Sequence, residues 1–331
     1  MSVLVTGGAG YIGSHMVLAL NDAGEDVVVI DNLSTGFRWA VPPSVPFVKG
    51  DIGDPATVRK VMSDHDVDAV VHFAGSIVVP ESVTDPLGYY NNNTVNSRSL
   101  IECCVEQGVK RMIFSSTAAV YGIPSTSAVT EDSPTDPISP YGASKLMTEW
   151  MLRDTSAAHD FNYVALRYFN VAGADPKGRS GQSNPAATHL LKALMRTALG
   201  ISDHMKIFGR DYDTRDGTCI RDYIHVSDLI LAHVAALNYL KRGGESGIFN
   251  CGYGHGCTVL EAIAAVERVL GQKINVIDAP RRAGDPPELI SVAERARSVL
   301  GWEPIYDNLD IIVQTAHAWE KALAERSNAA A

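Results

Sequence analysis

The first half of the chain alternates short runs of β-branched and other apolar residues with longer amphipathic stretches. Short apolar runs bounded by turn residues are typical of strands that are buried on both faces of a parallel sheet. These runs lie at residues 3–5, 27–30, 47–48, 69–72, 111–115 and 163–167. Six such strands separated by helices predict an α/β fold with a doubly wound parallel sheet.

Stretches with helical periodicity lie between these runs, at residues 12–23, 56–64, 89–107 and 141–158. After Asn170 the pattern changes, because residues 174–187 are rich in Gly, Pro, Ser and Asn and show no clear period. This segment predicts a linker or a loop that becomes ordered on binding. Further helices are predicted at residues 228–240, 259–270 and 309–322, with a loop at residues 251–257.

The change of pattern indicates two domains. We expect residues 1–172, joined by residues 221–250, to form a larger domain around the parallel sheet. Residues 173–331 would then form mainly a smaller C-terminal domain that binds substrate. With 331 residues, of which 46% are hydrophobic, the chain can bury a sizeable core.

The charge of the chain limits its partners. A formal net charge of -10 gives no global basic field that could hold nucleic acid or an anionic membrane. No stretch reaches the about 18 apolar residues of a transmembrane helix, and the N-terminus lacks the features of a signal peptide. The odd number of cysteines, five, with Cys103 and Cys104 adjacent, is a poor disulfide framework. We therefore expect a soluble cytoplasmic protein with no nucleic-acid or membrane partner.

One small cluster could suggest a metal site. Cys251, His255 and Cys257 lie close together in the sequence, but they supply three candidate ligands without the paired spacing of a zinc site. Buried thiols and a loop histidine explain them better. We predict no metal.

A glycine-rich loop follows the first predicted strand and opens the first helix, with glycines at Gly7, Gly10 and Gly13. Residues without Cβ allow the tight turn and the close approach of a pyrophosphate, whose charge the helix N-terminus favours. Such a turn can also serve only to join strand and helix, so its context matters. Asp31 closes the second strand, 24 residues after Gly7, where a carboxylate can accept both adenosine ribose hydroxyls and would repel a 2′-phosphate. Together these residues predict a Rossmann domain that binds NAD rather than NADP.

A second pattern predicts a catalytic base. Ser139 and Pro140 suit the start of a helix, on which Tyr141 and Lys145 are i and i+4 and share one face. An ammonium beside a phenol should lower a tyrosine pKa from about 10 toward neutrality. An isolated pair would also fit an amphipathic helix with Tyr packed inward and Lys outward. The hydroxyl of Thr117, at the carboxyl edge of the sheet where such folds bind ligands, favours catalysis.

These features occur in one order along the chain: residues 6–13, Asp31, residues 115–122, then Tyr141 and Lys145. The sequence thereby resembles the extended short-chain dehydrogenase/reductase family and, within it, the UDP-glucose 4-epimerases. The resemblance continues through residues 73–75, 90–93, 167–170, 207–209, 211–212, 216–218, 221–226 and 281–285. It covers the chain from residue 1 to about residue 290.

The resemblance implies a set of binding residues. Those that would contact NAD are Gly7, Gly10, Tyr11, Ile12, Gly13, Asp31, Asn32, Asp51, Ile52, Phe73, Ala74, Asn93, Ser115, Tyr141, Lys145 and Tyr168. Those that would contact the sugar nucleotide are Thr117, Tyr141, Asn170, His189, Arg221, Arg282 and Asp285. The arginines also fit physical reasoning, because an acidic protein needs localised guanidinium donors to hold a pyrophosphate. Taken singly, Asp51 would be read as a helix cap and either arginine as a surface charge.

The activity that the resemblance implies is reversible inversion at C4 of UDP-glucose and UDP-galactose, through a 4-keto intermediate and enzyme-held NADH. Tyr141, alone or through Thr117, would take the proton of the C4 hydroxyl, and Lys145 would hold the nicotinamide ribose. NAD would be bound tightly because it is regenerated in each turnover. The resemblance also implies a homodimer paired through helices 89–107 and 141–158.

Several alternatives stay open. Ala118 and Ala119 stand where dehydratases of the family carry an Asp-Glu pair, which makes a 4,6-dehydratase improbable. Leu289, at a position that helps to set the size of the sugar pocket, leaves N-acetylhexosamine and pentose substrates open. A uronate substrate also stays an alternative, although the sequence shows no partner for its carboxylate. An NAD-dependent sugar-nucleotide reductase or dehydrogenase remains an alternative, whereas a non-catalytic dinucleotide sensor would not need Tyr141, Lys145 and Thr117. Ile77 replaces a lysine that some epimerases place near the cofactor.

Overall fold

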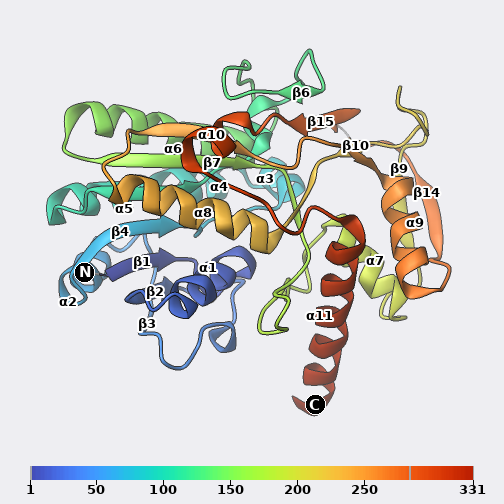
Figure 1. Cartoon of the computed structure of the whole chain (residues 1–331), viewed down its shortest axis with the longest axis horizontal. Coiled ribbons are helices and arrows are strands. Elements are labelled where there is room, and N and C mark those ends of the chain that lie inside the picture. Colours follow the sequence, from blue (N-terminus) through green and yellow to red (C-terminus); the bar gives the residue numbers. More distant parts are fainter. Residues whose placement is uncertain (1, 283–284, 331) are drawn as a thin grey trace.

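A seven-stranded parallel sheet forms the centre of the computed structural model, which describes residues 2–282 and 285–330, with side chains to residue 326. Its order is β12-β7-β5-β4-β1-β2-β3 (Figure 1). The strands are β1 Ser2–Thr6, β2 Val27–Asp31, β3 Phe47–Lys49, β4 Val67–His72, β5 Arg111–Ser115, β7 Asn162–Tyr168 and β12 Gly247–Cys251. The six predicted strands and the doubly wound fold are confirmed, and β12 adds a seventh strand that the apolar pattern did not reveal.

Helices cover both faces of this sheet because alternate residues of each strand point to opposite faces. On one face, Val3 and Val5 of β1 share a core with α1 Tyr11–Asp22 and α8 Val226–Lys241. On the other face, Leu4 shares a core with α2 Pro55–Asp64, α5 Asn96–Gln107 and α6 Pro140–Ala158. The predicted helices at 12–23, 56–64, 141–158 and 228–240 are therefore confirmed within a few residues.

The predicted helix at 89–107 is not one regular helix. The structure has α3 Val79–Thr84, α4 Pro86–Tyr89, a π-helical segment η2 Tyr90–Val95 and then α5. An apolar period cannot report a π-helical turn, because the turn only inserts extra residues into the helix. Here the turn brings Asn93 to a buried position, where its side chain bonds to Ser76 and Ser144.

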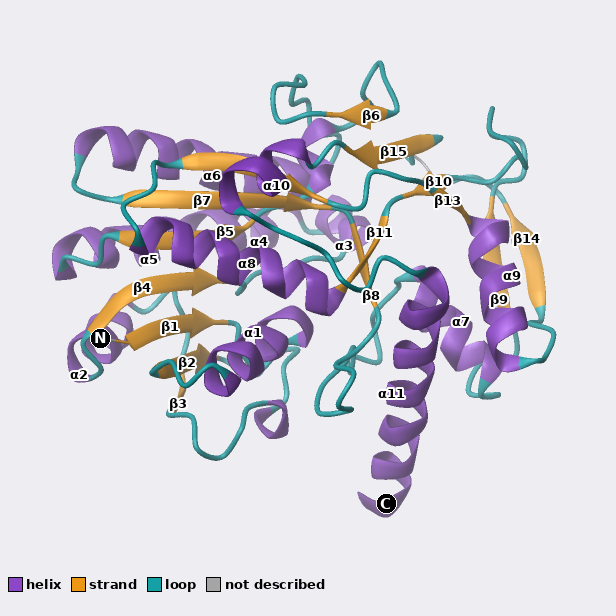
Figure 2. Ribbon diagram, viewed as in Figure 1, coloured by secondary structure: helices purple, strands orange, loops and turns teal. Residues whose placement is uncertain are grey.

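The rest of the chain forms a smaller mixed region beside the sheet (Figure 2). Its helices are α7 Leu190–Ala198, α9 Val259–Leu270, α10 Glu294–Leu300 and α11 Leu309–Ala330. Short strands pair as β13 Cys257–Thr258, β10 Ile220–Arg221, β15 Glu288–Ser291 and β6 Ala128–Val129, as β11 Tyr223–His225 with β8 Asn170–Ala172, and as β14 Val276–Ala279 with β9 Met205–Phe208. Neither α11, which runs beyond its predicted end, nor any other helix in the described part of the chain is long and apolar enough to cross a membrane.

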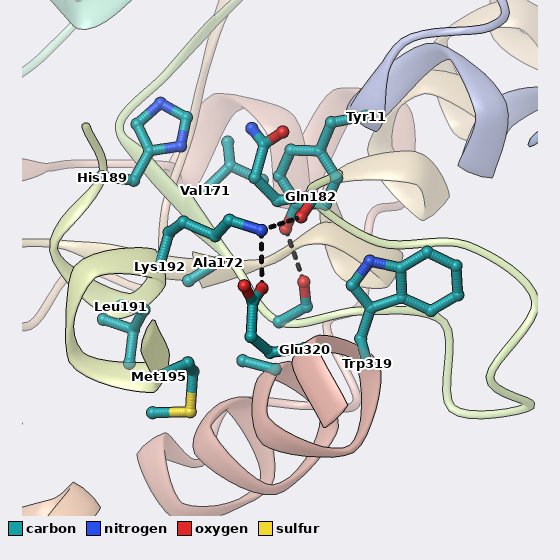
Figure 3. Close-up of a pocket in the computed structure, with 12 residues that line it drawn as sticks. Tyr11, Val171, Ala172, Gln182, His189, Leu191, Lys192, Met195, Trp319 and Glu320 are labelled. Atoms are coloured by element: carbon teal, nitrogen blue, oxygen red, sulfur yellow. Dashed lines mark hydrogen bonds and ion pairs between the residues drawn. The ribbon is translucent and has the colours of Figure 1, made fainter. Parts of the chain in front are cut away.

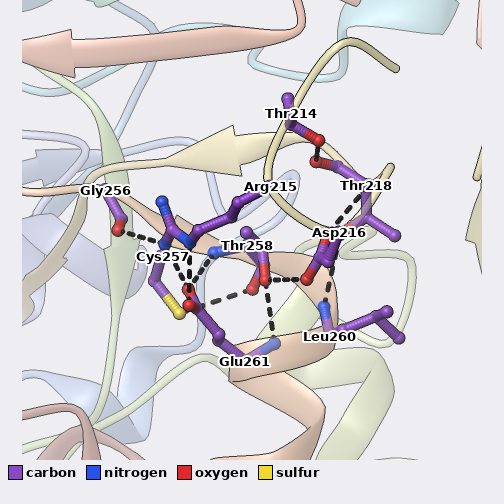
Figure 4. Close-up of polar contacts among 9 residues, drawn as sticks. All are labelled: Thr214, Arg215, Asp216, Thr218, Gly256, Cys257, Thr258, Leu260 and Glu261. Carbon is purple, nitrogen blue, oxygen red and sulfur yellow. Dashed lines mark hydrogen bonds and ion pairs between the residues drawn. The ribbon is translucent and has the colours of Figure 1, made fainter. Parts of the chain in front are cut away.

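A polar network fixes the loop before β10 to the start of α9 (Figure 4). Thr258 and Glu261 form a capping box, in which the Thr258 hydroxyl accepts from the Glu261 N–H at 3.0 Å. The Thr258 hydroxyl also donates to Asp216 at 2.5 Å, and Asp216 accepts from the N–H of Thr218 at 2.9 Å. Arg215 closes the network by pairing with Glu261. The network therefore anchors the segment that leads into Arg221.

The cysteines are separate thiols rather than a cluster. All five lie within the described residues and are free. Cys251 is buried at the end of β12, the thiol of Cys257 donates to the carbonyl of Thr258, and His255 lies 2.7 Å from the carboxylate of Asp307. Across residues 2–282 and 285–330, the structure contains no group of three His, Cys, Asp or Glu side chains arranged to hold a metal ion.

Candidate active site

The predicted site residues follow the carboxyl ends of neighbouring strands. Gly7 follows β1, Phe73 follows β4, Ser115 ends β5 and Tyr168 ends β7. These four strands are consecutive in the sheet, and the chain order reverses between β1 and β4. Ligands of open α/β sheets bind at such a switch point, so the structure brings these residues to the expected edge.

The glycine loop forms a cradle that side chains would fill. Gly7 has a φ of 68°, and a Cβ on it would lie 2.6 Å from the N of Ala74. A Cβ on Gly13 would overlap the carbonyl oxygen of Gly7, whereas one on Gly10 would meet only that oxygen, at 3.3 Å. Within the described residues no side chain caps the start of α1, so its first N–H groups remain for an anion. The loop therefore fits a dinucleotide pyrophosphate.

The Asp31 carboxylate is held in place by the backbone on both sides. Its Oδ2 accepts from the N–H of Ala9 at 2.9 Å, and its Oδ1 accepts from the N–H of Leu33 at 2.7 Å. Burial raises the pKa of Asp31, and the two backbone N–H groups oppose that shift. Each oxygen keeps a further lone pair, so the carboxylate can still accept from ribose hydroxyls.

Asp51 lies beside Asp31 but is not a helix cap. The amide of Asn32 donates to Asp51 at 2.9 Å, and the N–H of Gly53 donates to it at 2.7 Å. The cap of α2 is Asp54, which accepts from the N–H of Ala56 at 3.1 Å. The structure thus joins Asn32 and Asp51 at the edge where an adenosine is expected.

Tyr141 and Thr117 lie together in the site. Ser139 caps α6 by accepting from the N–H of Gly142 at 3.2 Å, which fixes Tyr141 in the first turn. Tyr141 is only 7% exposed, and the Thr117 hydroxyl is the polar neighbour that acts on its phenol. Burial raises the pKa of Tyr141, and the Thr117 hydroxyl only partly offsets this. The expected lowering of the Tyr141 pKa by Lys145 is therefore wrong for this structure.

The reason is the position of the Lys145 ammonium. Its Nζ donates to the backbone carbonyl of Ser115 at 3.1 Å and lies 4.9 Å from the ring centroid of Phe114. Burial lowers the pKa of Lys145 to about 8. The ammonium is held under the end of β5, so its interaction partners are a carbonyl and a ring face rather than the phenol.

Ser115 makes buried polar contacts with Tyr168 and with a residue that sequence reasoning missed, His233 of α8. Ser115 Oγ donates to the hydroxyl of Tyr168 at 3.2 Å and lies 3.3 Å from Nε2 of His233. The His233 ring also packs on Phe73, with centroids 4.9 Å apart. The ring centroid of His233 also lies 6.3 Å from that of Tyr168, so His233 neighbours three residues expected at the cofactor. It stands outside every motif, so no local signal marks it.

A buried ion pair supports the same strand ends and was also missed. Glu149 lies on α6, two turns beyond Tyr141, and pairs with Arg167 of β7 at 2.6 Å. Ser116, which precedes Thr117, donates to Glu149 at 2.5 Å. The pair therefore ties α6 to the segment that carries Thr117.

Besides Thr117 and Tyr141, the predicted sugar-nucleotide residues come from four separate segments. Arg221 of β10 lies 3.6 Å from Asp285, and the guanidinium of Arg282 lies 4.0 Å from the ring centroid of Phe208. Asn170 lies in β8, and His189 precedes α7, where burial and nearby Lys192 lower its pKa. The structure thus pairs Arg221 with Asp285 and gives Arg282 an aromatic partner. Ala283 and Gly284, between them in the matching motif, lie outside the described residues.

Leu289 lines the region where β10 and β15 meet. It is paired in register with Arg221 and packs in an apolar cluster with Ala118 and Leu146. Ala118 follows the strand-end Thr117, and Leu146 follows Lys145. The position is therefore a buried apolar one, next to both an expected pyrophosphate ligand and the catalytic helix.

Comparisons with known proteins agree on one family. The model of the NAD dependent epimerase/dehydratase family matches residues 3–252. A UDP-glucose 4-epimerase of Azospirillum brasilense is 58% identical over 98% of this chain and 93% of its own length. The structure of a UDP-glucose 4-epimerase from Brucella ovis in complex with NAD is 45% identical, with a TM-score of 0.93 over 96% of this chain and 97% of that one. The structure of a UDP-Glc/GlcNAc 4-epimerase from Campylobacter jejuni is 50% identical, with a TM-score of 0.85 over 97% and 99%.

Proposed function

The chain belongs to the NAD dependent epimerase/dehydratase family, and from this premise we propose that it interconverts UDP-glucose and UDP-galactose by inverting C4 of the sugar. The relatives at 58% and 47% identity over nearly the whole chain are UDP-glucose 4-epimerases. The enzyme is an isomerase, and its substrate is a UDP-sugar. The roles of individual residues follow from their geometry.

NAD is the cofactor of this enzyme, and the glycine cradle at Gly7 and Gly13 fits it because a Cβ at either position would collide with backbone. When bound, NAD supplies the oxidising and then the reducing equivalent for C4. Asp31 would bind its adenosine ribose, with Asn32 and Asp51 beside it. Since the same cofactor serves both half-reactions, the protein must hold it tightly.

Tyr141 acts as the catalytic base, alone or through Thr117. The phenolate of Tyr141 would take the proton of the C4 hydroxyl directly, or Thr117 would accept that proton while giving its own to the Tyr141 phenolate. Because burial raises its pKa, the Tyr141 phenol stays protonated near neutral pH, and only the phenolate can act as the base. Bound ligands must therefore help to ionise it. This pair, followed by Ala118 and Ala119 in place of acid-base residues, is the observation that carries the proposal.

Lys145 holds the nicotinamide ribose and stabilises the Tyr141 phenolate. Its Nζ is already aimed at the end of β5, where Ser115 and Thr117 lie. With NAD bound, the Lys145 ammonium would hold the nicotinamide ribose through its hydroxyls. Moving a cation closer to Tyr141 lowers the pKa of the phenol, which is the help that the base needs.

The nucleotide part of the substrate is held by groups away from the reacting carbon. Arg221 and Arg282 bind the pyrophosphate, with His189, Asn170 and Asp285 as further contacts. A firm grip on the nucleotide leaves the hexose free to turn, and one pocket can then present both faces of C4 to the cofactor.

The test is conversion of UDP-galactose to UDP-glucose by the purified enzyme with no NADH added or consumed. A single product with the absorbance at 340 nm unchanged supports the proposal. Stoichiometric change at 340 nm would instead identify a reductase or dehydrogenase, and no conversion would reject the epimerase.

A second candidate substrate is a UDP-N-acetylhexosamine. The Campylobacter jejuni relative, 50% identical, is described as acting on both UDP-glucose and its N-acetylated counterpart. Leu289 is smaller than an aromatic residue, so it leaves more room for an acetamido group. UDP-N-acetylgalactosamine and UDP-arabinose belong in the same assay, and the ratio of kcat/KM values decides the preference.

We further propose that two chains pair through α5, α6 and the helices before them. Val83, Leu87, Val95 and Trp150 are between 47% and 78% exposed, an unusual amount of apolar surface in one region. Helices presented side by side can bury such residues across a two-fold axis.

The five free thiols favour the cytoplasm as the compartment. We also propose two domains: residues 1–172 joined by 221–250 form the cofactor-binding domain, and residues 173–331 mainly form the substrate-binding domain.

A further inference from the structure

An aromatic cluster joins segments that are far apart in the sequence, close to the glycine loop. Trp39, in η1 Arg38–Ala40 after β2, lies between Phe37 and Trp319 of α11, with centroid distances of 5.2 and 6.0 Å. The guanidinium of Arg326 lies 4.9 Å from the Trp39 centroid and 5.5 Å from that of Trp319. A cation between two indoles stabilises both contacts. The C-terminal helix is therefore attached to the loop that follows Asp31.

Trp319 also packs on the segment at residues 174–187. Its side chain is buried, at 3% exposure, and a Cβ on Gly181 would overlap its indole ring. Only a residue without a side chain lets the ring lie directly against the backbone here. The indole thus holds this segment from the side of α11.

The opposite side of the same segment is fixed to α1. Ser180 shares a hydrogen bond of 2.6 Å with Ser14, and both side chains are buried. Arg179 pairs with Asp22 at 2.8 Å and with Asp175 at 2.7 Å. A segment that the sequence predicts as a linker or binding loop therefore lies packed between α1 and α11.

A small cavity of about 10 Å³ separates this segment from the glycine loop. One wall is Ala9, Gly10 and Tyr11, a second is Thr35, Phe37 and Ala40, and the third is Ser14 with residues 180–184. Gly10 is the open side of the cradle at the start of α1, where the cofactor pyrophosphate is expected. Residues 180–184, which we call the roof, thus lie across this cavity from Gly10 and Tyr11.

A second cavity, of about 30 Å³, lies on the other side of Tyr11 and Gln182 (Figure 3). Here Lys192 donates to the carbonyl of Gln182 at 2.7 Å and pairs with Glu320 of α11 at 2.5 Å. Trp319 lines the same cavity, and its buried Nε1 has no partner in the described part of the chain. Through Trp319 and Glu320, adjacent residues of α11 therefore hold adjacent residues of the roof, Gly181 and Gln182.

We infer that Trp319 is a positioning residue for the cofactor: it holds residues 180–184 over the pyrophosphate and so sets how slowly NAD leaves the enzyme. Lifting of the roof from α1 would let the cofactor leave, and the indole against Gly181 opposes that movement. The inference rests on the proposed function only in that NAD is the cofactor. It explains how an enzyme that reuses one NAD molecule could retain it between turnovers.

The test measures NAD dissociation from the purified holoenzyme. Each protein is incubated with an excess of thio-NAD, desalted at intervals, and the NAD that remains is quantified by chromatography. We expect Trp319→Ala to release NAD about tenfold faster or more, because it removes the contacts with Gly181 and Trp39. Trp319→Phe, which keeps a ring, should restore most of the retention. Gln314→Ala, on the exposed face of the same helix, is the matched control and should release NAD at the wild-type rate.

A split between retention and catalysis separates positioning from a general structural defect. Turnover by Trp319→Ala should fall on dilution and return when NAD is added. An unchanged dissociation rate, or a loss of turnover that added NAD does not restore, would overturn the inference. If Trp319→Ala does not fold, Arg326→Ala tests the same aromatic cluster, because its guanidinium lies on Trp39 and Trp319. Release of NAD at the wild-type rate by that variant would also overturn the inference. A wild-type enzyme that holds no NAD, or that shows this behaviour without converting any UDP-sugar, would count against the proposed function instead.

Discussion

The ammonium of Lys145 donates to the backbone carbonyl of Ser115 at 3.1 Å, which places a buried cation directly beneath the end of β5. Ser115 is two residues before Thr117, so the cation and the hydroxyl of the proposed relay are fixed by the same strand end. The position favours catalysis but has a cost for the folded state, because the charge is removed from water.

That cost predicts a pH-dependent difference in stability. Burial lowers the pKa of Lys145 from 10.5 to about 8, so between these pH values the unfolded chain binds more protons than the native one. Native stability therefore gains from this residue as the pH rises from 8 to 10.5, and the full penalty applies below pH 8. Lys145→Met should be more stable than wild type at pH 7 by up to about 3 kcal/mol, with the difference shrinking toward pH 10.

Urea unfolding at pH 7 and pH 10 measures this. Lys60→Met is the control, because Lys60 is exposed and should show no such change between the two pH values. A difference for Lys145→Met that stays constant with pH would contradict the assignment.

Loss of the phenol should separate cofactor binding from chemistry. Tyr141→Phe keeps the ring in the first turn of α6, so NAD content after purification should match wild type. Without the proton acceptor, kcat should fall by about 10²- to 10⁴-fold. Tyr239→Phe serves as the control. Among the described residues, the Tyr239 hydroxyl accepts only from the N–H of Glu245. Near-normal turnover by Tyr141→Phe would remove this residue from the mechanism.

The glycine cradle predicts a steric effect on cofactor content. Gly13→Ala places a methyl group against the carbonyl of Gly7, which must move and so distort the turn. We expect the purified variant to carry little or no NAD. Gly24→Ala meets open space but keeps a positive φ of 72°, so it should lose only about 1 kcal/mol of stability and retain its NAD. Full NAD content in Gly13→Ala would show that the loop is only a connection between strand and helix.

Removing one partner of the Glu149–Arg167 pair should lower the free energy of unfolding more than replacing both partners together. Both side chains are buried, and removing one charge leaves the other without compensation. Glu149→Gln should lower the free energy of unfolding by about 3–5 kcal/mol. The double variant Glu149→Met/Arg167→Leu should lose less than the single one, as urea denaturation would reveal. Equal losses from the single and double variants would mean that Ser116, not the ion pair, dominates.

The proposed dimer can be tested at its apolar surface. Leu87→Glu and Trp150→Glu place charges where two chains would bury apolar side chains, so light scattering should report a monomer for either variant. Ile305 is also exposed and apolar but lies on the loop between α10 and α11, so Ile305→Glu should leave the mass unchanged. A wild-type monomer would reject the pairing outright.

The glycine loop and the start of α6 could be predicted from sequence because their physics is local. Gly7, Gly13 and the Ser139 cap act within a few residues of their own position. The same holds for the short apolar runs that form the buried strands β1 and β2. Tyr141 and Lys145 could be placed on one helix for the same reason.

Other parts of the site could not be read in this way because they depend on distant segments. His233 lies 118 positions from Ser115, and Trp319 contacts Gly181 and Trp39 only in the folded chain. The Lys145 ammonium was expected beside Tyr141, but the carbonyl of Ser115 and the ring of Phe114 hold it instead. Helical spacing indicates which residues share a face, but it does not indicate which acceptor the Lys145 ammonium will bond to.

The way that the backbone holds Asp31 also bears on changing the cofactor. A designer who wished this enzyme to accept a 2′-phosphorylated dinucleotide would begin by removing that carboxylate. Doing so would leave the N–H groups of Ala9 and Leu33 without their acceptor, and Ala9 lies inside the glycine loop itself. The residue expected to discriminate between the two cofactors therefore also braces the glycine turn, so a reversal of preference calls for a replacement that supplies new acceptors for those two groups.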